Sequence, residues 1–168
     1  MPDTGAPWNI TYVASSDLVK DWPTDNQTMA ESIADALDDA WKVRQVVTAS
    51  TSTTTSTSST SRVNTSLTAT ITPTDATSQV LVIAAFEELQ STNSGSDCVV
   101  DVYNGTSSST VTATREDTGS NYGMNITYLD SPASASAVTY TAQVRLVGSA
   151  ATVRVRGWQT LVLMEVGP

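Results

Sequence analysis

Carboxylates are the residues of this sequence that are numerous enough to support catalysis. The 168 residues include 17 Asp and Glu but no His and one Cys. Without an imidazole, neither a Ser-His-Asp nor a Cys-His nucleophile can form, and most zinc catalysis loses a ligand. Two carboxylates could still hydrolyse a glycosidic bond, and adjacent pairs occur at Glu87-Glu88 and Glu116-Asp117. Adjacent strand residues point to opposite faces, so neither pair could flank one bond. We expect no enzyme activity and no cofactor.

Metal and phosphate chemistry has little more support. Cys98 is alone, so it can form no disulfide within the chain and no cysteine zinc site, and we expect a buried or half-buried thiol. The Asp residues lack the spacing of a calcium-binding loop, and no Gly-rich phosphate loop is present. The sequence leaves open whether Asp97 and Asp101 share a metal ion, and no metal site is predicted from it.

Charge and hydropathy exclude two further classes of partner. The net charge is −9 and only 8 Lys and Arg are spread over the chain, whereas nucleic-acid binding needs clustered cations. The longest apolar run, Val80 to Phe86, is far shorter than the roughly 20 residues of a membrane helix. The N-terminus lacks the pattern of a signal peptide. We therefore expect one domain with an extension, without nucleic acid and without membrane insertion.

The first 23 residues form an aromatic, proline-containing arm that is too irregular to build its own core. Either the arm folds back onto the protein's own helix, or it docks into a neighbouring protein, where Trp and Tyr are the usual anchors. We favour docking, because the chain offers little else in this segment to cover the aromatic rings. The predicted docking residues are Trp8, Tyr12 and Trp22.

One amphipathic helix is predicted over residues 24–47. Thr24 and Gln27 have the spacing of a capping box, which predicts the helix start. Apolar residues then recur at steps of three and four and form one stripe. An isolated helix of this length is marginal in water, so the stripe must pack, either on the β-domain or on two other copies in a three-helix bundle. We favour the bundle, with an interface of Met29, Ile33, Leu37 and Trp41.

Residues 48–61 form a tract in which every residue except Ala49 is serine or threonine. The tract is soluble and compatible with β structure, and it contains neither Gly nor Pro. It can serve as an extended spacer or lead into a first edge strand. A plain disordered linker is the remaining alternative.

Residues 62–168 have the patterns of a β-sandwich. "SLTATIT" and "AVTYTAQVRLV" alternate between apolar and polar side chains, and about seven or eight short strands are separated by Gly, Asn, Asp, Ser and Pro turns. "QVLVIAAF" is apolar on both faces, which predicts a central strand covered by the opposing sheet on one side and by a subunit or helix on the other. Phe86 and Trp158 are expected in the core. The predicted fold is mainly β, a jelly-roll-like antiparallel sandwich preceded by the arm and helix.

Two parts of the chain resemble proteins of bacteriophage particles. "SLTATITPTDATSQVLVIAAF" and "YLDSPASASAVTYTAQVRLVGSAATVRVRGW" are similar to the head domains of phage tail-fibre and head-fibre proteins, in which "ITP" followed by a "VLV"-like strand and "LDSP" followed by "VTY" recur. "GAPWNITYVASSDLVKDWPTDNQTMAESIADAL" resembles the N-terminal segments of phage structural and minor tail proteins. The resemblance covers most of the chain, and its motifs are structural.

The resemblance implies a homotrimer on the virion surface. Its N-terminal part, residues 1–47, would attach to other virion proteins of the capsid or tail, residues 48–61 would be the spacer, and residues 62–168 would be the outward head. Three weak sites on one axis can bind a multivalent cell surface tightly, which favours attachment to a host glycan or protein. The alternative is a decoration protein that only cements or coats the particle. The candidate binding loops contain Asn93, Asp97, Asn104, Glu116, Asp117 and Tyr122, whose ring could stack on a sugar.

Overall fold

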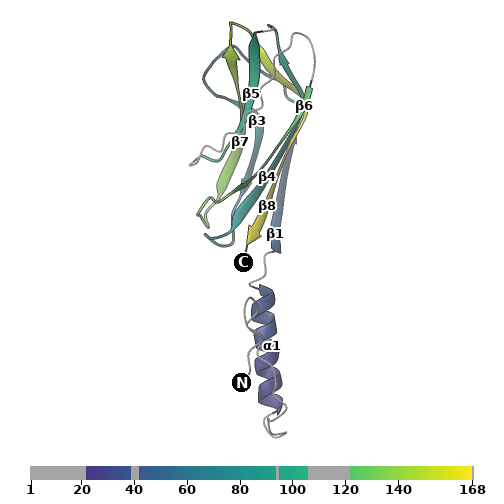
Figure 1. Cartoon of the computed structure of the whole chain (residues 1–168), viewed down its shortest axis with the longest axis vertical. Coiled ribbons are helices and arrows are strands. Elements are labelled where there is room, and N and C mark those ends of the chain that lie inside the picture. The colour runs from purple at the N-terminus through teal and green to yellow at the C-terminus, as the bar shows by residue number, and fades with distance from the viewer. Residues whose placement is uncertain (1–21, 39–41, 94, 106–121, 168) are drawn as a thin grey trace. The chain divides into compact units, whose positions relative to one another are not determined.

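The computed structural model describes residues 22–38, 42–93, 95–105 and 122–167. The chain divides into two compact units. The helix α1 (Trp22–Asp38) belongs to the first unit, and residues 43–166 form the second. Figure 1 shows the helix and the strands.

The helix differs from its prediction at both ends. It begins at Trp22, so that Pro23 falls in the first turn, where its missing N–H is tolerated. The predicted capping box is not formed, because the Gln27 side chain donates to Glu31 Oε1 at 2.8 Å and Thr24 accepts from Thr28 through its carbonyl. The helix ends at Asp38 and does not reach residue 47.

The segment that was predicted as the end of the helix is a strand. Residues Lys42–Thr51 form β1, which pairs with the last strand of the chain. Its sequence "KVRQVVTAST" is rich in β-branched side chains, which lose rotamer freedom in a helix and pack well on a pleated surface. The apolar spacing of three and four residues did not distinguish a helix from a strand in this segment. Pairing with β8 outweighs the local periodicity here.

The predicted mainly β fold is confirmed as a sandwich of two antiparallel sheets (Figure 1). Within the described residues, one sheet has the order β1-β8-β4-β6 with β2 also on β8, and the other has the order β3-β7-β5. The remaining strands are β2 (Thr55–Thr57), β3 (Val63–Ile71), β4 (Gln79–Ser91), β5 (Ser96–Tyr103), β6 (Tyr122–Asp130), β7 (Val138–Gly148) and β8 (Val153–Gly167).

This strand order is that of a jelly roll. The first and last strands are neighbours in one sheet, and the second and second-last long strands are neighbours in the other, as in two interlocked Greek keys. The eighth strand of a jelly roll would come between β5 and β6 in the chain. The sequence predicts a strand there, over residues 110–116, which lie outside the described residues.

The Ser/Thr tract is part of the sandwich, which corrects its interpretation as a spacer. Its first residues end β1, and Thr55–Thr57 form β2, which pairs with Val153–Val155 of β8. The carbonyl of Ser59 then accepts a hydrogen bond from Leu146 N of β7, at 2.8 Å. The tract thus leads from one sheet to the other, and its short hydroxyl side chains allow that close crossing.

The core lies between the sheets and is made by alternating residues of both. Phe86 is buried there, as predicted, and so is Tyr140. Trp158 is not in the core: its side chain is 64% exposed. Gln159 points inward, so strand alternation turns Trp158 outward. The buried aliphatic members include Leu67, Ile71, Val80, Val82, Ile126, Val144, Leu161 and Leu163.

Candidate functional site

The candidate loop residues that the structure describes are largely engaged within the chain. The Asn93 amide donates to the carbonyl of Ala150 at 3.2 Å, and its oxygen accepts from Gly95 N. The side chain of Asn104 is buried and donates to Asp130 Oδ2 at 2.7 Å. Both asparagines therefore hold their loops in shape, and they are poorly placed to bind an external ligand.

The other candidate residues are distributed between strands and the undescribed part of the chain. Asp97 lies on β5 and is half-buried, and Tyr122 begins β6 opposite Leu89 of β4. Glu116 and Asp117 lie outside the described residues, as do Trp8, Tyr12 and Trp41. The structure therefore does not bring the described candidates together into one site.

A buried carboxylate that the sequence did not single out organises this end of the core. Asp130 Oδ2 accepts hydrogen bonds from Asn104 Nδ2 and from the Tyr140 hydroxyl, both at 2.7 Å. Burial and the neighbouring Asp130 carboxylate raise the pKa of Tyr140 far above its ordinary value. The Tyr140 hydroxyl therefore stays protonated and donates a hydrogen bond to the Asp130 carboxylate. The "LDSP" phrase, which includes Asp130, was a signal for this position.

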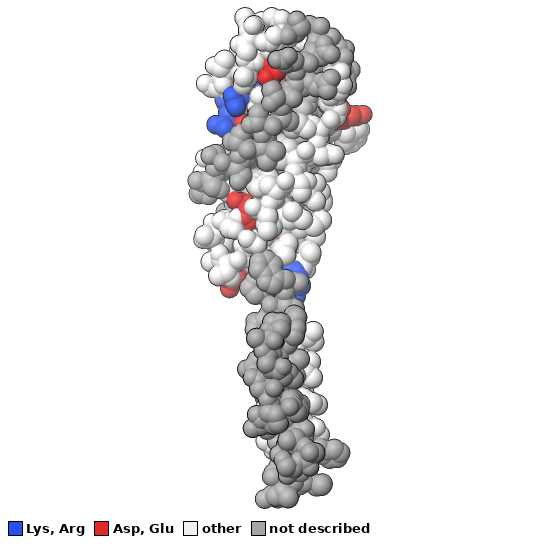
Figure 2. Space-filling view, in the orientation of Figure 1, with Lys and Arg blue, Asp and Glu red and all other residues white. Residues whose placement is uncertain are grey.

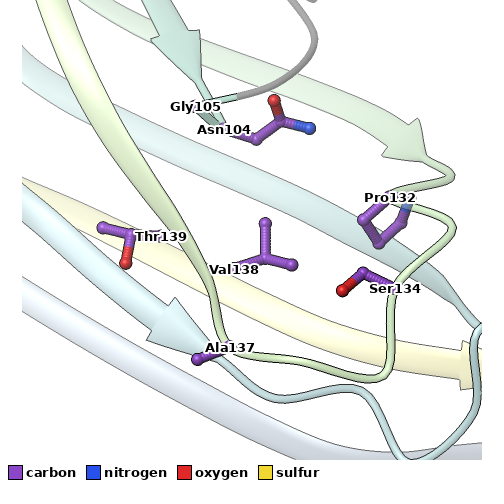
Figure 3. A pocket seen from close by; sticks show the side chains of 7 residues that line it. All are labelled: Asn104, Gly105, Pro132, Ser134, Ala137, Val138 and Thr139. Atoms are coloured by element: carbon purple, nitrogen blue, oxygen red, sulfur yellow. The ribbon is translucent and has the colours of Figure 1, made fainter.

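A cavity of about 280 Å³ lies beside this network (Figure 3). Figure 3 shows Asn104 and Gly105 facing Val138 and the loop that carries Pro132 and Ser134. No charged side chain lines it. Such a cavity could admit a small neutral polar group, but it offers no constellation for catalysis. Its lining residues are Asn104, Gly105, Pro132, Ser134, Ala137, Val138 and Thr139.

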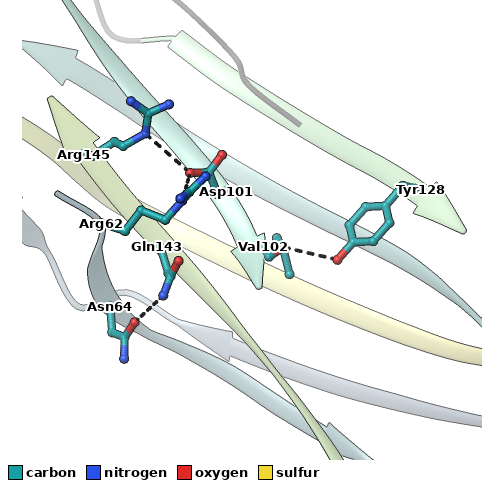
Figure 4. Close-up of polar contacts among 7 residues, drawn as sticks. All are labelled: Arg62, Asn64, Asp101, Val102, Tyr128, Gln143 and Arg145. Carbon is teal, nitrogen blue, oxygen red and sulfur yellow. Dashed lines mark hydrogen bonds and ion pairs between the residues drawn. The ribbon is translucent and has the colours of Figure 1, made fainter. Parts of the chain in front are cut away.

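An ion cluster lies on the outer face of the β3-β7-β5 sheet (Figure 4). The buried Asp101 carboxylate accepts from Arg62 Nε at 2.8 Å, and Arg145 Nε lies 3.7 Å from the same oxygen. In Figure 4 dashed lines join Asp101 to Arg62 and to Arg145. Two cations beside one carboxylate do not suit a metal ion that Asp97 and Asp101 would share. Among the described residues, no group of three or more metal-ligating side chains occurs.

A second buried carboxylate, Glu165, lies near the C-terminal end of β8 and accepts hydrogen bonds from neighbouring segments. It is fully buried and accepts from Gln45 Nε2 at 2.6 Å, from Thr74 N at 2.7 Å and from Thr74 Oγ1 at 2.6 Å. Burial by itself would raise the pKa of Glu165, but these hydrogen bonds outweigh it and lower the pKa to about 2. Glu165 thus ties β1 and the β3–β4 connection to β8, which is a structural role.

The remaining reactive groups in the described part of the chain are also held structurally. Glu87 accepts from the Trp158 backbone at 2.6 Å, and Glu88 pairs with Arg156, so the two adjacent carboxylates have different partners. Cys98 is buried, as expected, and burial raises the pKa of its thiol to about 12. This thiol stays protonated at neutral pH and is a poor nucleophile.

The outer face of the β1-β8-β4-β6 sheet carries apolar side chains that do not belong to the core of the described residues. Its side chains are in register in three rows across β6, β4 and β8, and none of the nine is charged. Leu129 in the first row is 52% exposed, and the inner members are half-buried without belonging to the core. We call these residues the apolar face; its rows are Leu129-Leu81-Met164, Thr127-Ile83-Val162 and Asn125-Ala85-Thr160.

Two exposed side chains extend the apolar face. Val46 on β1, the strand beyond β8, is 51% exposed, and Trp158 follows the third row along β8. In the space-filling view of Figure 2, charged side chains of the described β-domain form separate small patches with uncharged surface between them. The prediction that "QVLVIAAF" forms a central strand was correct. This segment lies in β4, which has a neighbouring strand on each side and apolar side chains on both faces.

The helix has an apolar stripe that its own unit leaves accessible. Ile33 is 38% exposed and Leu37 is 66% exposed, whereas Met29 is half-buried. Its last turn carries no basic residue.

In the described part of the chain, no helix is long and apolar enough to span a membrane.

Comparisons with known proteins identify no family. No family model matches the chain, and no curated protein matches it. Among solved structures, the VP2 subviral particle of infectious bursal disease virus matches with a TM-score of 0.41 and 13% identity, over 73% of this chain and 39% of that chain. The Gx strain of that virus matches with a TM-score of 0.41 and 14% identity, over 76% and 38%. This chain spans less than two fifths of those chains, and scores this low carry no argument about function.

Proposed function

We propose that this chain is a non-enzymatic structural protein of a bacteriophage particle. It forms a homotrimer that is attached to other virion proteins by its N-terminal arm and presents the β-sandwich for contact with a host-surface glycan or protein. The observation that carries the proposal is the jelly-roll strand order in a unit separate from the N-terminal helix. This fold is common in virus particles, and because a fold alone does not define function, the resemblance to phage fibre proteins is the second support.

The chemistry of the described residues agrees with a binding or building role. Each buried carboxylate there has donors from its own domain, as Asp130 has from Asn104 and Tyr140. Carboxylates that accept such hydrogen bonds stabilise a fold, which agrees with a structural role for these groups.

The helix supports the trimeric form of this proposal. Ile33 and Leu37 lie one turn apart on α1 and are exposed in the single chain. Three such stripes would bury one another around an axis, and Met29 and Trp41 would extend the contact. Trp8, Tyr12 and Trp22 would then anchor the arm in the particle.

A decoration protein without a receptor-binding role is the second candidate. The specific observation in its favour is that Asn93 and Asn104, expected at the binding loops, are bonded within the chain. In that case the sandwich would cover the particle, and Glu116, Asp117 and Tyr122 would have no ligand.

Particle labelling tests the shared part of both candidates. Gold-labelled antibodies against the β-domain are applied to particles purified from the source of the sequence. We expect regular labelling of the particle surface and loss of the protein from particles when residues 1–21 are deleted. Particles that lack the protein would overturn the proposal. Binding of the purified chain to host cells, competed by cell-surface glycan, then separates attachment from decoration.

A further inference from the structure

We propose that Asn104 is a deamidation site whose reaction is held back by its hydrogen bond to Asp130. Asn104 is the only asparagine of the sequence that is followed by glycine. In such a pair the backbone nitrogen of the glycine can attack the side-chain amide, because the glycine has no side chain to shield it. The proposal does not depend on the proposed function, since it concerns a reaction within the β-domain and not its partners.

The reaction is a cyclisation followed by a hydrolysis. The backbone nitrogen of Gly105 forms a bond to Cγ of Asn104, and the bond between Cγ and Nδ2 breaks. The proton of the Gly105 amide leaves with Nδ2 as ammonia, and a cyclic imide remains. Water then opens the ring at one of its carbonyl groups. The product is aspartate in the original backbone, or isoaspartate with an additional carbon in the main chain.

The surroundings of Gly105 leave room for this attack. Gly105 lies directly after the end of β5 with a φ of +84°, and a Cβ built on it would meet no atom within 4 Å. The cavity that Asn104 and Gly105 help to line has polar and apolar walls and provides space for the water that opens the imide. Neither steric cover nor dryness therefore protects this peptide bond.

Hydrogen bonds hold the pair in place instead. Asn104 is only 4% exposed, and its Nδ2 donates to Asp130 Oδ2 at 2.7 Å. The carbonyl of Gly105 accepts from the Tyr103 hydroxyl at 2.9 Å. Cyclisation requires Nδ2 to leave, so its strong hydrogen bond to a carboxylate must break first. The folded domain thus slows a reaction that its sequence favours.

Deamidation would loosen this end of the core irreversibly. An aspartate in place of Asn104 has no N–H to donate, so a second carboxylate would lie within hydrogen-bond distance of the Asp130 carboxylate. Like charges at this distance repel each other. A transient opening of the network would therefore be converted into a permanent change at the end of β5.

Mass spectrometry of the full chain tests the proposal. The chain is incubated at mildly alkaline pH in buffer and in urea, and peptide mapping assigns each deamidation to a residue. We expect Asn104 to be the fastest site in urea. In the folded chain we expect it to react at least about tenfold more slowly, because the reaction then waits for a local opening.

A pair of variants separates the Asp130 hydrogen bond from general stability. Asp130→Ala removes the acceptor, and we expect the rate at Asn104 in the folded chain to rise at least about fivefold. Val155→Ala is the matched control. Val155 is fully buried and pairs with Leu89 near the end of β4, whereas Asp130 pairs with Val80 near its start. This cavity lowers stability away from the network, so we expect a rate within about twofold of wild type.

Several results would overturn the proposal. These are no reaction at Asn104 in urea, equal rates in buffer and urea, an unchanged rate in folded Asp130→Ala, and an equal acceleration by Val155→Ala. Should Asp130→Ala fail to fold by circular dichroism, Asp130→Asn replaces it, because a neutral amide oxygen is a weaker acceptor than a carboxylate. We then expect the rate to rise at least about twofold, and an unchanged rate would refute the role of Asp130.

Asn104→Asp tests the consequence of the reaction. We expect it to lower the midpoint of urea unfolding more than Asn64→Asp does. Asn64→Asp adds the same charge at an exposed residue of β3 and keeps the oxygen that accepts from Gln143 Nε2. Equal shifts in the two variants would refute the loosening of the core by deamidation.

Discussion

The two sheets of the sandwich share one core but have different outer faces. The β3-β7-β5 sheet presents hydroxyl, amide and charged groups that bond to one another, such as Thr70 with Thr139 at 2.8 Å. The β1-β8-β4-β6 sheet presents Leu81, Ile83 and Val162, which have no such partners. The two faces differ in side-chain chemistry. The outer face of the β3-β7-β5 sheet is polar and is bonded in part within the chain, although Asp101 Oδ1 and Gln143 Oε1 are buried there without a hydrogen-bond partner, whereas the outer face of the other sheet is largely apolar.

The largest expected effect comes from breaking the ion cluster of the polar face. Asp101→Ala leaves Arg62 and Arg145 without their carboxylate, and we expect the free energy of unfolding to fall by about 3 kcal/mol. Urea unfolding measures this change. The loss should be the same at all protein concentrations, because the cluster lies within one chain. A dependence on concentration would show that the polar face contacts other copies.

Glu165→Gln tests how firmly β1, the edge of the apolar face, is held. The substitution places an amide N–H₂ among donors from Gln45 and Thr74, and we expect a loss of about 2 kcal/mol in the free energy of unfolding at pH 7.

The same carboxylate predicts a pH dependence. The folded pKa of about 2 lies below the ordinary value of 4.5, so Glu165 contributes stability above pH 4.5 that is lost as the pH falls through about 2. Thermal unfolding from pH 6 to pH 2 should therefore show the difference between wild type and Glu165→Gln shrinking with acid. A constant difference would contradict the role of the ionised group.

Ile83→Thr probes the centre of the apolar face. Within one chain we expect a loss of only about 1 kcal/mol, because the side chain is half-buried and threonine also suits a strand. Unfolding curves measure this loss. Light scattering of the wild type and of Ile83→Thr at two concentrations shows whether this face contacts other copies, and equal scattering of the two would contradict such a contact through Ile83.

Thr70→Val is the matched change on the polar face and has the smallest expected effect. It removes the exposed hydroxyl pair with Thr139 and keeps the β-branched shape, so we expect a loss of about 0.5 kcal/mol or less. Thermal unfolding checks it. A marked increase in oligomerisation would show that any apolar substitution on this domain promotes contact, which would weaken the comparison.

The pattern of single strands was predictable, whereas the boundaries near residues 38–61 were not. "VTYTAQVRLV" alternates between apolar and polar residues because one face of β7 lies in the core, and this alternation can be recognised in the sequence alone. Residues Lys42–Thr51 have apolar spacing compatible with either a helix or a strand, and only pairing with β8 selects the strand. The Ser/Thr tract has no apolar pattern, so its pairing at Thr55–Thr57 depends on β8 alone.

The candidate site was less predictable than the fold. Loop composition indicated Asn93 and Asn104, but composition does not reveal that Ala150 and Asp130, far away in the chain, accept their hydrogen bonds. Trp158 was expected in the core because large aromatic residues usually are, and it lies outside because Gln159 faces in.

The sequence by itself determined that the chain has a helix and a mainly β domain, that histidine chemistry is absent, and that β4 is apolar on both faces. These properties depend on residue type and on local periodicity. Only the tertiary structure decided the strand order, the union of Leu129, Leu81 and Met164 into one face, and the bonding of Asp101, Asp130 and Glu165. The physical reason is that these contacts join strands far apart in the chain, and their partners are set by the register of the whole sandwich.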